Sequence, residues 1–335
     1  MPPVSGLTLG KFAPFHAGHR WLLETALAEC DEVTCLVYDS PGVTRIPLPV
    51  RAGWIRALYP RVQVVEVWGG PGEVGESAAI RAAHERHVLE VLGIRRVDRF
   101  YSGESYGAHM SRALGALDRR VDRSRSSFPI SGRAIRADPF AHRSFLHPIV
   151  YRDHVTTAVF LGAPGTGKTT LVAHLARELE TAWMPEYGRE YWDRHQVGRR
   201  LAPEQLVEIA EGHWWREEAL VGEARGSFLV DTNALTTTVF ARYYHGAVHP
   251  RLEAIAEACG RHYDLVFLCG DEFPGPVTRD RSGAGSRSLM QRMVEQDLLA
   301  RRIAAVRLTG PVDERARVVR EALACYRKWG EDPSA

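Results

Sequence analysis

Residues 162–169 read GAPGTGKT, and this run restricts the possible folds of the chain more than any other feature. It matches the pattern G-x-x-x-x-G-K-[ST] at every position, between an apolar run over residues 155–161 and a helical pattern over residues 169–179. In that context, backbone N–H groups and a helix N-terminus converge on phosphate. A simple glycine turn accounts for neither the lysine nor the hydroxyl. The sequence therefore predicts a phosphate-binding loop in an α/β fold.

The loop also predicts its own chemistry. Lys168 would reach the outer phosphates of a nucleotide, and the hydroxyl of Thr169 would hold Mg²⁺. A second Mg²⁺ ligand is expected at the end of a later strand, and Asp231 follows an apolar run there, although an aspartate in this place also suits a helix N-cap. The residues predicted to bind ATP in this half are Gly162, Gly165, Thr166, Gly167, Lys168, Thr169 and Thr170.

Three further segments of this half are candidates for substrate contacts. Residues 185–190 (PEYGRE) would line an acceptor pocket or form a solvated helix start, with Glu186 a second candidate for a base. The glycine-rich stretch 273–288 is predicted to be a mobile loop whose Arg281 closes over the transferred phosphate, or a plain exposed loop. The residues predicted to bind substrate here are Tyr187, Arg189 and Asn233.

A second motif lies near the N-terminus, where residues 10–19 read GKFAPFHAGH. It follows a predicted strand over residues 6–10 and opens a predicted helix over residues 18–29. His16 and His19 would lie together at the helix N-terminus, where imidazole N–H groups stabilise charge developing on phosphates, and Lys11 adds a point charge. Metal ligation is the competing reading, but no third ligand is near in the sequence. Two histidines of the core are a weaker alternative.

Strand and helix patterns alternate twice along the chain. Further strands are predicted at 33–38, 62–67 and 100–102, with helices at 50–58 and 77–92, the latter capped by Ser77. After residue 150 the alternation restarts, with strands at 228–230, 265–268 and 305–308. This alternation of strands and helices predicts parallel sheets covered by helices on both faces. With 335 residues, we expect two domains, 1–152 and 153–335.

Composition narrows the environment and the partners. A net charge of +2 does not suggest a nucleic-acid partner, and neither a signal peptide nor a run of about 18 apolar residues is visible. The five cysteines form no C-x-x-C pair, and Cys30, Cys35, Cys259 and Cys269, which lie near apolar runs, are expected to be small buried residues. Only three of the 43 lysine and arginine residues are lysine, and two of these three lie in the two phosphate motifs. We expect a cytoplasmic protein without stable membrane insertion. The sequence does not decide whether the protein forms a homo-oligomer.

These motifs carry a family resemblance. Residues 10–19 resemble the first signature of the nucleotidylyltransferase superfamily, and residues 130–136 (ISGRAIR) resemble its second, I-S-x-T-x-x-R. With a phosphate-binding loop, E-Y-G-R-E and D-T-N following in that order, the chain resembles the NadR-type enzymes. These combine a nicotinamide-mononucleotide adenylyltransferase with a ribosylnicotinamide kinase. The resemblance runs over roughly residues 6–326 and implies a Rossmann-like fold before a P-loop kinase fold.

The resemblance implies two reactions and their residues. The C-terminal half would phosphorylate nicotinamide riboside with ATP, and the N-terminal half would join nicotinamide mononucleotide to a second ATP, giving NAD and pyrophosphate with Mg²⁺ as cofactor. Arg136 would bind ATP phosphates together with Lys11, His16 and His19. The remaining implied contacts are Gly10, Phe12, Gly18 and Ser131 with ATP, and Arg51 and Trp54 with substrate.

Three departures from the family pattern keep other readings open. Arg133 replaces a threonine of the second signature, residues 279–282 match the family lid D-G-x-R-S only loosely, and no helix-turn-helix precedes residue 6, so we expect no repressor role. One alternative is an N-terminal half that senses nucleotide and regulates the kinase. Others are a membrane-associated scaffold and an adenylyltransferase–kinase fusion for another phosphate substrate.

Overall fold

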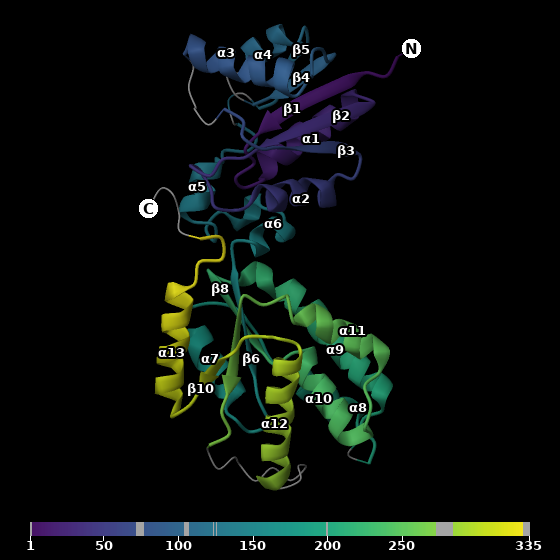
Figure 1. The fold of residues 1–335 in the computed structure, drawn as a ribbon, viewed down its shortest axis with the longest axis vertical. Helices are drawn as coiled ribbons and strands as arrows, with labels where there is room; N and C mark the ends of the chain where they lie inside the picture. The colour runs from purple at the N-terminus through teal and green to yellow at the C-terminus, as the bar shows by residue number, and fades with distance from the viewer. Residues whose placement is uncertain are drawn as a thin grey trace. The chain divides into compact units, whose positions relative to one another are not determined.

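A computed structural model gives the fold (Figure 1) and describes residues 2–71, 77–103, 107–122, 124, 126–198, 200–272 and 284–330. The chain divides into two compact units. The first runs to Tyr151 and takes in Trp329 and Gly330 as well, and the second is Arg152–Lys328. The passage between the units thus lies one residue before the boundary expected from the sequence.

The first unit is built on a parallel sheet of five strands in the order β3-β2-β1-β4-β5. β1 lies at its centre, so the chain adds strands first on one side and then on the other. The carboxyl ends of β1 and its neighbours therefore meet where a ligand site is expected in open α/β sheets. The strands are β1 (Ser5–Gly10), β2 (Glu32–Tyr38), β3 (Val62–Val67), β4 (Arg99–Ser102) and β5 (Leu117–Arg120).

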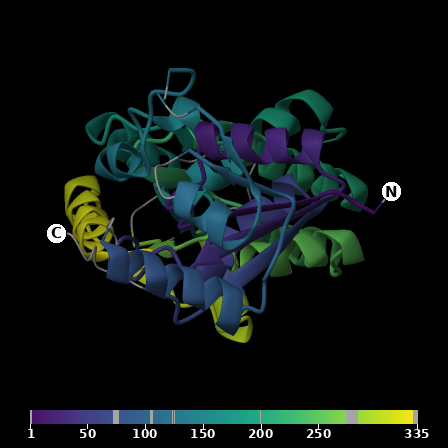
Figure 2. The same cartoon turned by 90° about the horizontal axis from the view of Figure 1, so that it is seen from above.

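Helices cover both faces of this sheet. In Figure 2, α1 (purple) and α3 (blue) lie on opposite sides of the strands. Leu7, Leu36 and Phe100 of the strands pack with Val88 and Met110 on the α3 side, and all five are buried. The helices are α1 (Ala17–Glu29), α2 (Leu48–Leu58), α3 (Ala78–Arg86), α4 (Gly107–Ala113), α5 (Gly132–Ala137) and α6 (Pro148–Arg152), whose last residue already counts with the second unit.

A charged network joins the end of α1 to the strands. The carboxylate of Glu29 accepts hydrogen bonds from Nε of Arg119 at 2.9 Å, from the Tyr101 hydroxyl at 2.8 Å and from Arg99 at 3.2 Å. Arg119 contributes most to lowering the pKa of Glu29 to about 2, with Tyr101 and Arg99 acting in the same direction against burial. The network therefore stabilises the fold only while Glu29 is ionised.

Replacing Glu29 by glutamine tests this network. The folded pKa is depressed, so the stabilisation is complete above the ordinary pKa of 4.5 and is lost as the pH falls through about 2. We expect Glu29→Gln to lower the free energy of unfolding by about 0.5–1 kcal/mol at pH 6, the value for solvent-accessible pairs. The difference should shrink steadily towards pH 2 in urea unfolding curves. A difference that stays constant with pH contradicts the assignment.

The second unit repeats the plan with the sheet order β10-β9-β6-β8-β7, again parallel in every pairing. β6 is central and pairs with β8 on one side and β9 on the other. Phe160 and Phe267 stack in its core, with ring centroids 5.1 Å apart. The strands are β6 (Thr156–Leu161), β7 (Trp183–Met184), β8 (Ser227–Asp231), β9 (Leu265–Cys269) and β10 (Val306–Leu308).

Helices again flank the sheet on two sides (Figure 1). α7 and α13 pack together on one face, where Leu171, Leu175 and Val319 meet the strands. On the other face α10 contacts α9, α11 and α12. The helices are α7 (Lys168–Glu178), α8 (Tyr187–His195), α9 (Pro203–Leu220), α10 (Ala234–His245), α11 (Pro250–Cys259), α12 (Ala284–Ala300) and α13 (Val312–Cys325).

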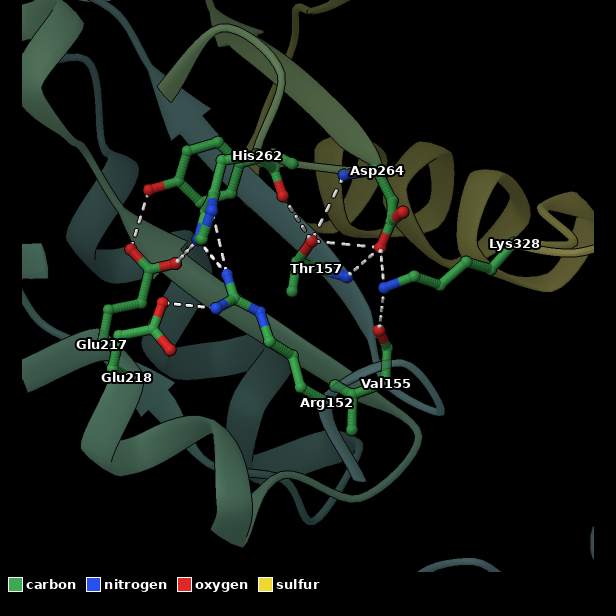
Figure 3. A network of polar contacts seen from close by, with 9 residues as sticks. Arg152, Val155, Thr157, Glu217, Glu218, His262, Asp264 and Lys328 are labelled. Atoms are coloured by element: carbon green, nitrogen blue, oxygen red, sulfur yellow. Dashed lines mark hydrogen bonds and ion pairs between the residues drawn. The ribbon is translucent and has the colours of Figure 1, made fainter. Parts of the chain in front are cut away.

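Arg152 and Lys328, the two ends of the second unit, are both bound near the starts of β6 and β9 (Figure 3). Arg152 donates to His262 Nδ1 at 2.9 Å and also binds Glu218. Lys328, the third lysine of the chain, donates to the carbonyl of Val155 at 2.9 Å and pairs with Asp264 at 3.1 Å. These contacts secure the first and last residues of the unit beside the starts of β6 and β9.

The predicted fold class is confirmed, with differences at short elements. β5 and β7 were not predicted; β7 has two residues, and β5 (Leu117–Arg120) carries mainly charged side chains, so neither shows a strand pattern. The helix predicted over residues 77–92 begins as expected, with the Ser77 hydroxyl accepting from the N–H of Ile80 at 3.3 Å. It ends in a π-helical turn, His87–Val91, which sequence periodicity does not distinguish from an α-helix.

Candidate functional site

The loop between β6 and α7 has the form that its motif predicts. A Cβ on Gly162 would lie 2.7 Å from the carbonyl oxygen of Cys269, and its φ is +138°, so only glycine fits there. Lys168 is 8% exposed, and its ammonium donates to the carbonyls of Gly162 at 2.9 Å and Ala163 at 3.0 Å. The Thr166 hydroxyl donates to Ala163 at 2.9 Å. The side chain of Lys168 and the backbone of the loop are thus held together at the start of α7.

Thr169 and Asp231, predicted from separate parts of the sequence, lie together. The Thr169 hydroxyl donates to Oδ2 of Asp231 at 2.5 Å. Within the described part of the chain, Oδ1 of Asp231 is buried and has no hydrogen-bond partner. Burial raises the pKa of Asp231, and the nearby Lys168 ammonium opposes that rise. A hydroxyl and an unpaired carboxylate oxygen are the donors that Mg²⁺ prefers, so these residues fit the ion.

A pocket of about 290 Å³ opens beside the loop. Glu186 and Arg189 line it and pair with each other at 3.2 Å, so part of the PEYGRE segment lies beside the phosphate loop at the start of α8, and its role in binding the acceptor stays a prediction. A carboxylate and a guanidinium side by side on one wall can accept and donate hydrogen bonds, which suits an acceptor that carries hydroxyl groups. The lining residues are Pro164, Gly165, Gly167, Lys168, Thr169, Thr170, Glu186, Arg189, Thr232, Thr236 and Phe240.

Other predicted residues of this half lie away from the pocket wall. Tyr187 packs on α9, where the guanidinium of Arg216 lies 4.0 Å above its ring. Asn233 caps α10 by accepting from the N–H of Leu235 at 3.0 Å. Their substrate contacts stay predictions. Arg281 and residues 273–283 of the predicted mobile loop lie outside the described residues. Residues 284–288, which the sequence predicts to belong to the same loop, instead form the start of α12, a helix that runs on to Ala300.

Two buried side chains that sequence reasoning missed hold the phosphate loop. Gln291 of α12, 2% exposed, accepts from the N–H of Ala163 at 2.8 Å and donates to the Cys269 carbonyl at 3.2 Å. Arg315 of α13 donates to the carbonyl of Thr166 at 2.7 Å. The signal available for Arg315 was a charged residue next to Ala316 and one turn before Val319 on the apolar side of a helical pattern.

In the first unit, His16 and His19 stack at the start of α1, with ring centroids 3.8 Å apart. The backbone N–H of His16 donates to Nδ1 of His19 at 3.3 Å, which places the proton of a neutral His19 ring on Nε2. Phe12 packs edge-on against His19 at 4.9 Å and over Gly10, where a Cβ would lie 3.2 Å from its ring. The first motif therefore forms one ordered cluster.

The second signature meets the first through Arg136. Its guanidinium donates to the carbonyl of Ala13, and Gly132 approaches the same oxygen so closely that a Cβ would lie 2.7 Å from it. The Ser131 hydroxyl caps α5 by accepting from the N–H of Ala134 at 3.2 Å. Arg133, the departure from the family pattern, is exposed on the first turn of that helix. The structure thus brings together the two segments that the sequence linked only by resemblance.

Arg51 and Trp54, predicted to contact substrate, lie in the interior and are 1% and 2% exposed. Arg51 donates to the carbonyls of Lys11, of Ile46 at 3.0 Å and of Tyr38 at 2.8 Å. This geometry favours a supporting role in which Arg51 fixes the backbone of Lys11 at the end of β1. The predicted substrate contacts of both residues stay untested by the fold.

Two features are absent from the described residues. No cluster of three or more His, Cys, Asp or Glu side chains is arranged to hold a metal ion there. No helix among these residues has the length and apolar character needed to cross a membrane.

Comparison with known proteins agrees with both halves. A family model described as an AAA domain matches residues 157–315. The trifunctional NAD biosynthesis/regulator protein NadR of Escherichia coli (strain K12) is 26% identical over 87% of this chain and 76% of its own length. NadR of Salmonella typhimurium (strain LT2) is 27% identical over 88% and 75%. The predicted relationship is confirmed: the chain is homologous to NadR over most of its length.

Solved structures of similar proteins agree with the fold. A crystal structure of NadR in complex with NAD and AMP-PNP is 21% identical, has a TM-score of 0.57 and matches over 97% of both chains. Another, in complex with NR, is 20% identical, with a TM-score of 0.58 over 97% of this chain and 98% of that one. At this identity the likeness shows the two-unit α/β architecture.

Proposed function

We propose that this protein is a bifunctional enzyme of NAD biosynthesis that makes nicotinamide mononucleotide and then NAD. The observation that carries the proposal is that the residues of two phosphate-binding motifs each form a compact cluster, in one chain that is homologous to NadR over most of its length. The second unit phosphorylates nicotinamide riboside with ATP. The first unit transfers the adenylyl group of a second ATP to the mononucleotide and releases pyrophosphate.

In the kinase unit, the residues act mainly by positioning and charge neutralisation. Lys168 moves from the loop carbonyls to the nucleotide phosphates, which offer it a full negative charge. Thr169 and Asp231 would hold Mg²⁺, which when bound would neutralise charge on the phosphate oxygens. The riboside hydroxyl enters the pocket from the side of Glu186 and Arg189, where Glu186 accepts its proton. The pairing of Thr169 with the unsatisfied carboxylate of Asp231 supports this arrangement.

In the adenylyltransferase unit, the phosphate of the mononucleotide is the nucleophile, so no side chain has to form a covalent bond. His16, His19, Lys11 and Arg136 surround the start of α1, and the helix N-terminus adds positive partial charge. Donors placed there stabilise the charge that develops on the α-phosphate and on the departing pyrophosphate. The exposed position of Arg133 leaves the cap of α5 intact, which supports an active unit.

Two parallel assays test the proposal on the purified protein with Mg²⁺-ATP. One contains nicotinamide riboside, the other nicotinamide mononucleotide, and both products are quantified. We expect mononucleotide and NAD from the first assay and NAD from the second. Mononucleotide without NAD would replace adenylyl transfer by a sensor role for the N-terminal unit. No product in either assay would overturn the proposal and assign both sites to other substrates.

A further inference from the structure

One guanidinium is buried directly beneath the phosphate loop. Arg315 lies in the first turn of α13 and is 3% exposed. Its neighbours on the helix, Ala316 and Val319, belong to the apolar core that α13 shares with α7 and the sheet. Taking an arginine out of water in this position is costly unless its donors are satisfied. Its partners therefore show what the side chain is there to hold.

The donors of Arg315 reach the loops that follow three neighbouring strands. Nη1 donates to the carbonyl of Thr166, after β6, at 2.7 Å. Nη2 donates to the carbonyl of Gly270, after β9, at 3.2 Å and to Glu272 at 3.0 Å. Nε donates to the carbonyl of Gly310, after β10, at 2.8 Å. One planar fork thus connects the carboxyl ends of β6, β9 and β10, a task that lysine with its single nitrogen does not perform.

The contact with Thr166 fixes the orientation of a peptide that faces the phosphates. In a planar trans peptide, the C=O and the following N–H point in opposite directions. Because the carbonyl of Thr166 is held towards Arg315, the N–H of Gly167 is directed away from it, at the N-terminus of α7. That is the side on which nucleotide phosphate is bound by such loops. Without Arg315, the hydrogen bond that keeps the Thr166 carbonyl turned away from the negative phosphates is lost.

The same side chain supplies charge to the site. A guanidinium that is 3% exposed is poorly screened by solvent, and its carboxylate partner, Glu272, is 36% exposed. The positive member of this ion pair therefore lies directly against the phosphate loop, on the carbonyl of Thr166. We propose that Arg315 is a positioning residue of the kinase unit, which orients the phosphate loop and favours binding of the ATP triphosphate. This inference rests on the proposed kinase function.

Methionine and lysine at position 315 test the proposal in the full-length protein. In Arg315→Met we expect the KM for ATP in riboside phosphorylation to rise at least tenfold, with the KM for riboside unchanged within twofold. Arg315→Lys keeps the charge without the fork, and we expect a rise of about threefold to fivefold. Adenylyl transfer by the first unit, measured on the same preparations, should stay at the wild-type rate.

Arg317 provides the matched control. It lies two residues further along α13, is 59% exposed and pairs with Glu321, so Arg317→Met should alter neither KM. A purely structural role for Arg315 would lower the melting temperature and the active fraction while leaving both KM values unchanged, and that result would overturn the proposal. The proposal would also be overturned if, in both Arg315→Met and Arg315→Lys, the KM for riboside rose as much as the KM for ATP.

A direct binding measurement separates this inference from the assigned substrate. Calorimetric titration with ATP should show two sites in the wild type and weakening of one of them in Arg315→Met. If the wild-type protein fails to phosphorylate riboside but one ATP site is weakened in Arg315→Met, the substrate assignment is wrong and the role of Arg315 stands. If riboside is phosphorylated and both ATP sites are unchanged in the variant, the role of Arg315 is wrong.

Discussion

Replacement of Lys168 by alanine is expected to reduce riboside phosphorylation by at least about a thousandfold, because it removes the ammonium that neutralises charge on the transferred phosphate. In the structure this ammonium is held within hydrogen-bond distance of two loop carbonyls, a short movement from where the phosphates would lie. Adenylyl transfer from ATP to nicotinamide mononucleotide should remain at the wild-type rate. Both rates are measured on one preparation by product quantification.

Arginine at position 168 serves as the charge-matched control. The guanidinium is larger and planar, and the space between Gly162 and Ala163 accommodates a compact ammonium, so Lys168→Arg should also lose most kinase activity. Coupled loss of both activities in Lys168→Ala would contradict independent sites. Retained phosphorylation would show that the loop does not bind the phosphoryl donor.

Replacement of His19 by alanine should have the opposite selectivity. We expect adenylyl transfer to fall about a hundredfold to a thousandfold, the usual cost of removing one preorganised donor at a site of developing charge. Riboside phosphorylation should not change. The decisive measurement is NAD formation from mononucleotide and ATP, with the kinase rate as the internal measure of folded protein.

Phe12 and Phe15 also contact His19, at ring-centroid distances of 4.9 and 6.0 Å, so alanine leaves a gap in an aromatic cluster. Glutamine at position 19 fills more of that space and keeps a donor, and we expect it to recover part of the lost rate. Equal, complete losses in both variants, together with a lower melting temperature, would mean that His19 is a packing residue. An unchanged rate in His19→Ala would exclude it from the adenylyl-transfer site.

Motif residues were predictable because local chemistry dictates them. Residues 162–169 form their loop from backbone geometry and the spacing of two glycines, and Asp231 is the last residue of a strand whose apolar run is visible in the sequence. The meeting of Thr169 with Asp231 also followed, since parallel strands end at one edge of a sheet. The second signature was linked to the first only by resemblance, and the bond from Arg136 to Ala13 gives that link a physical basis.

Contacts that depend on long-range packing were not predictable. Arg315 is 149 residues from Thr166, and Gln291 is 128 residues from Ala163, and no local pattern reports such distances. Arg51 shows the reverse situation, in which a substrate contact predicted from the sequence stays untested. It stands beside a motif and carries charge, which suits a ligand contact, yet burial and three backbone carbonyls occupy its donors. Sequence shows which residues are capable of chemistry, whereas packing decides which atoms are available for it.

The contacts of Arg152 and Lys328 determine how this protein can be cut apart. The chain enters the kinase unit at the first of these residues and leaves it at the second, and Asp264 receives both Lys328 and the Thr157 hydroxyl, the latter at 3.0 Å (Figure 3). A kinase excised after residue 152, at the boundary read from the sequence, would leave His262 and Glu218 without their guanidinium. Because both ends converge on the starts of β6 and β9, the excised unit has to run from Arg152 to Lys328, and a short linker between those ends makes it a candidate for circular permutation.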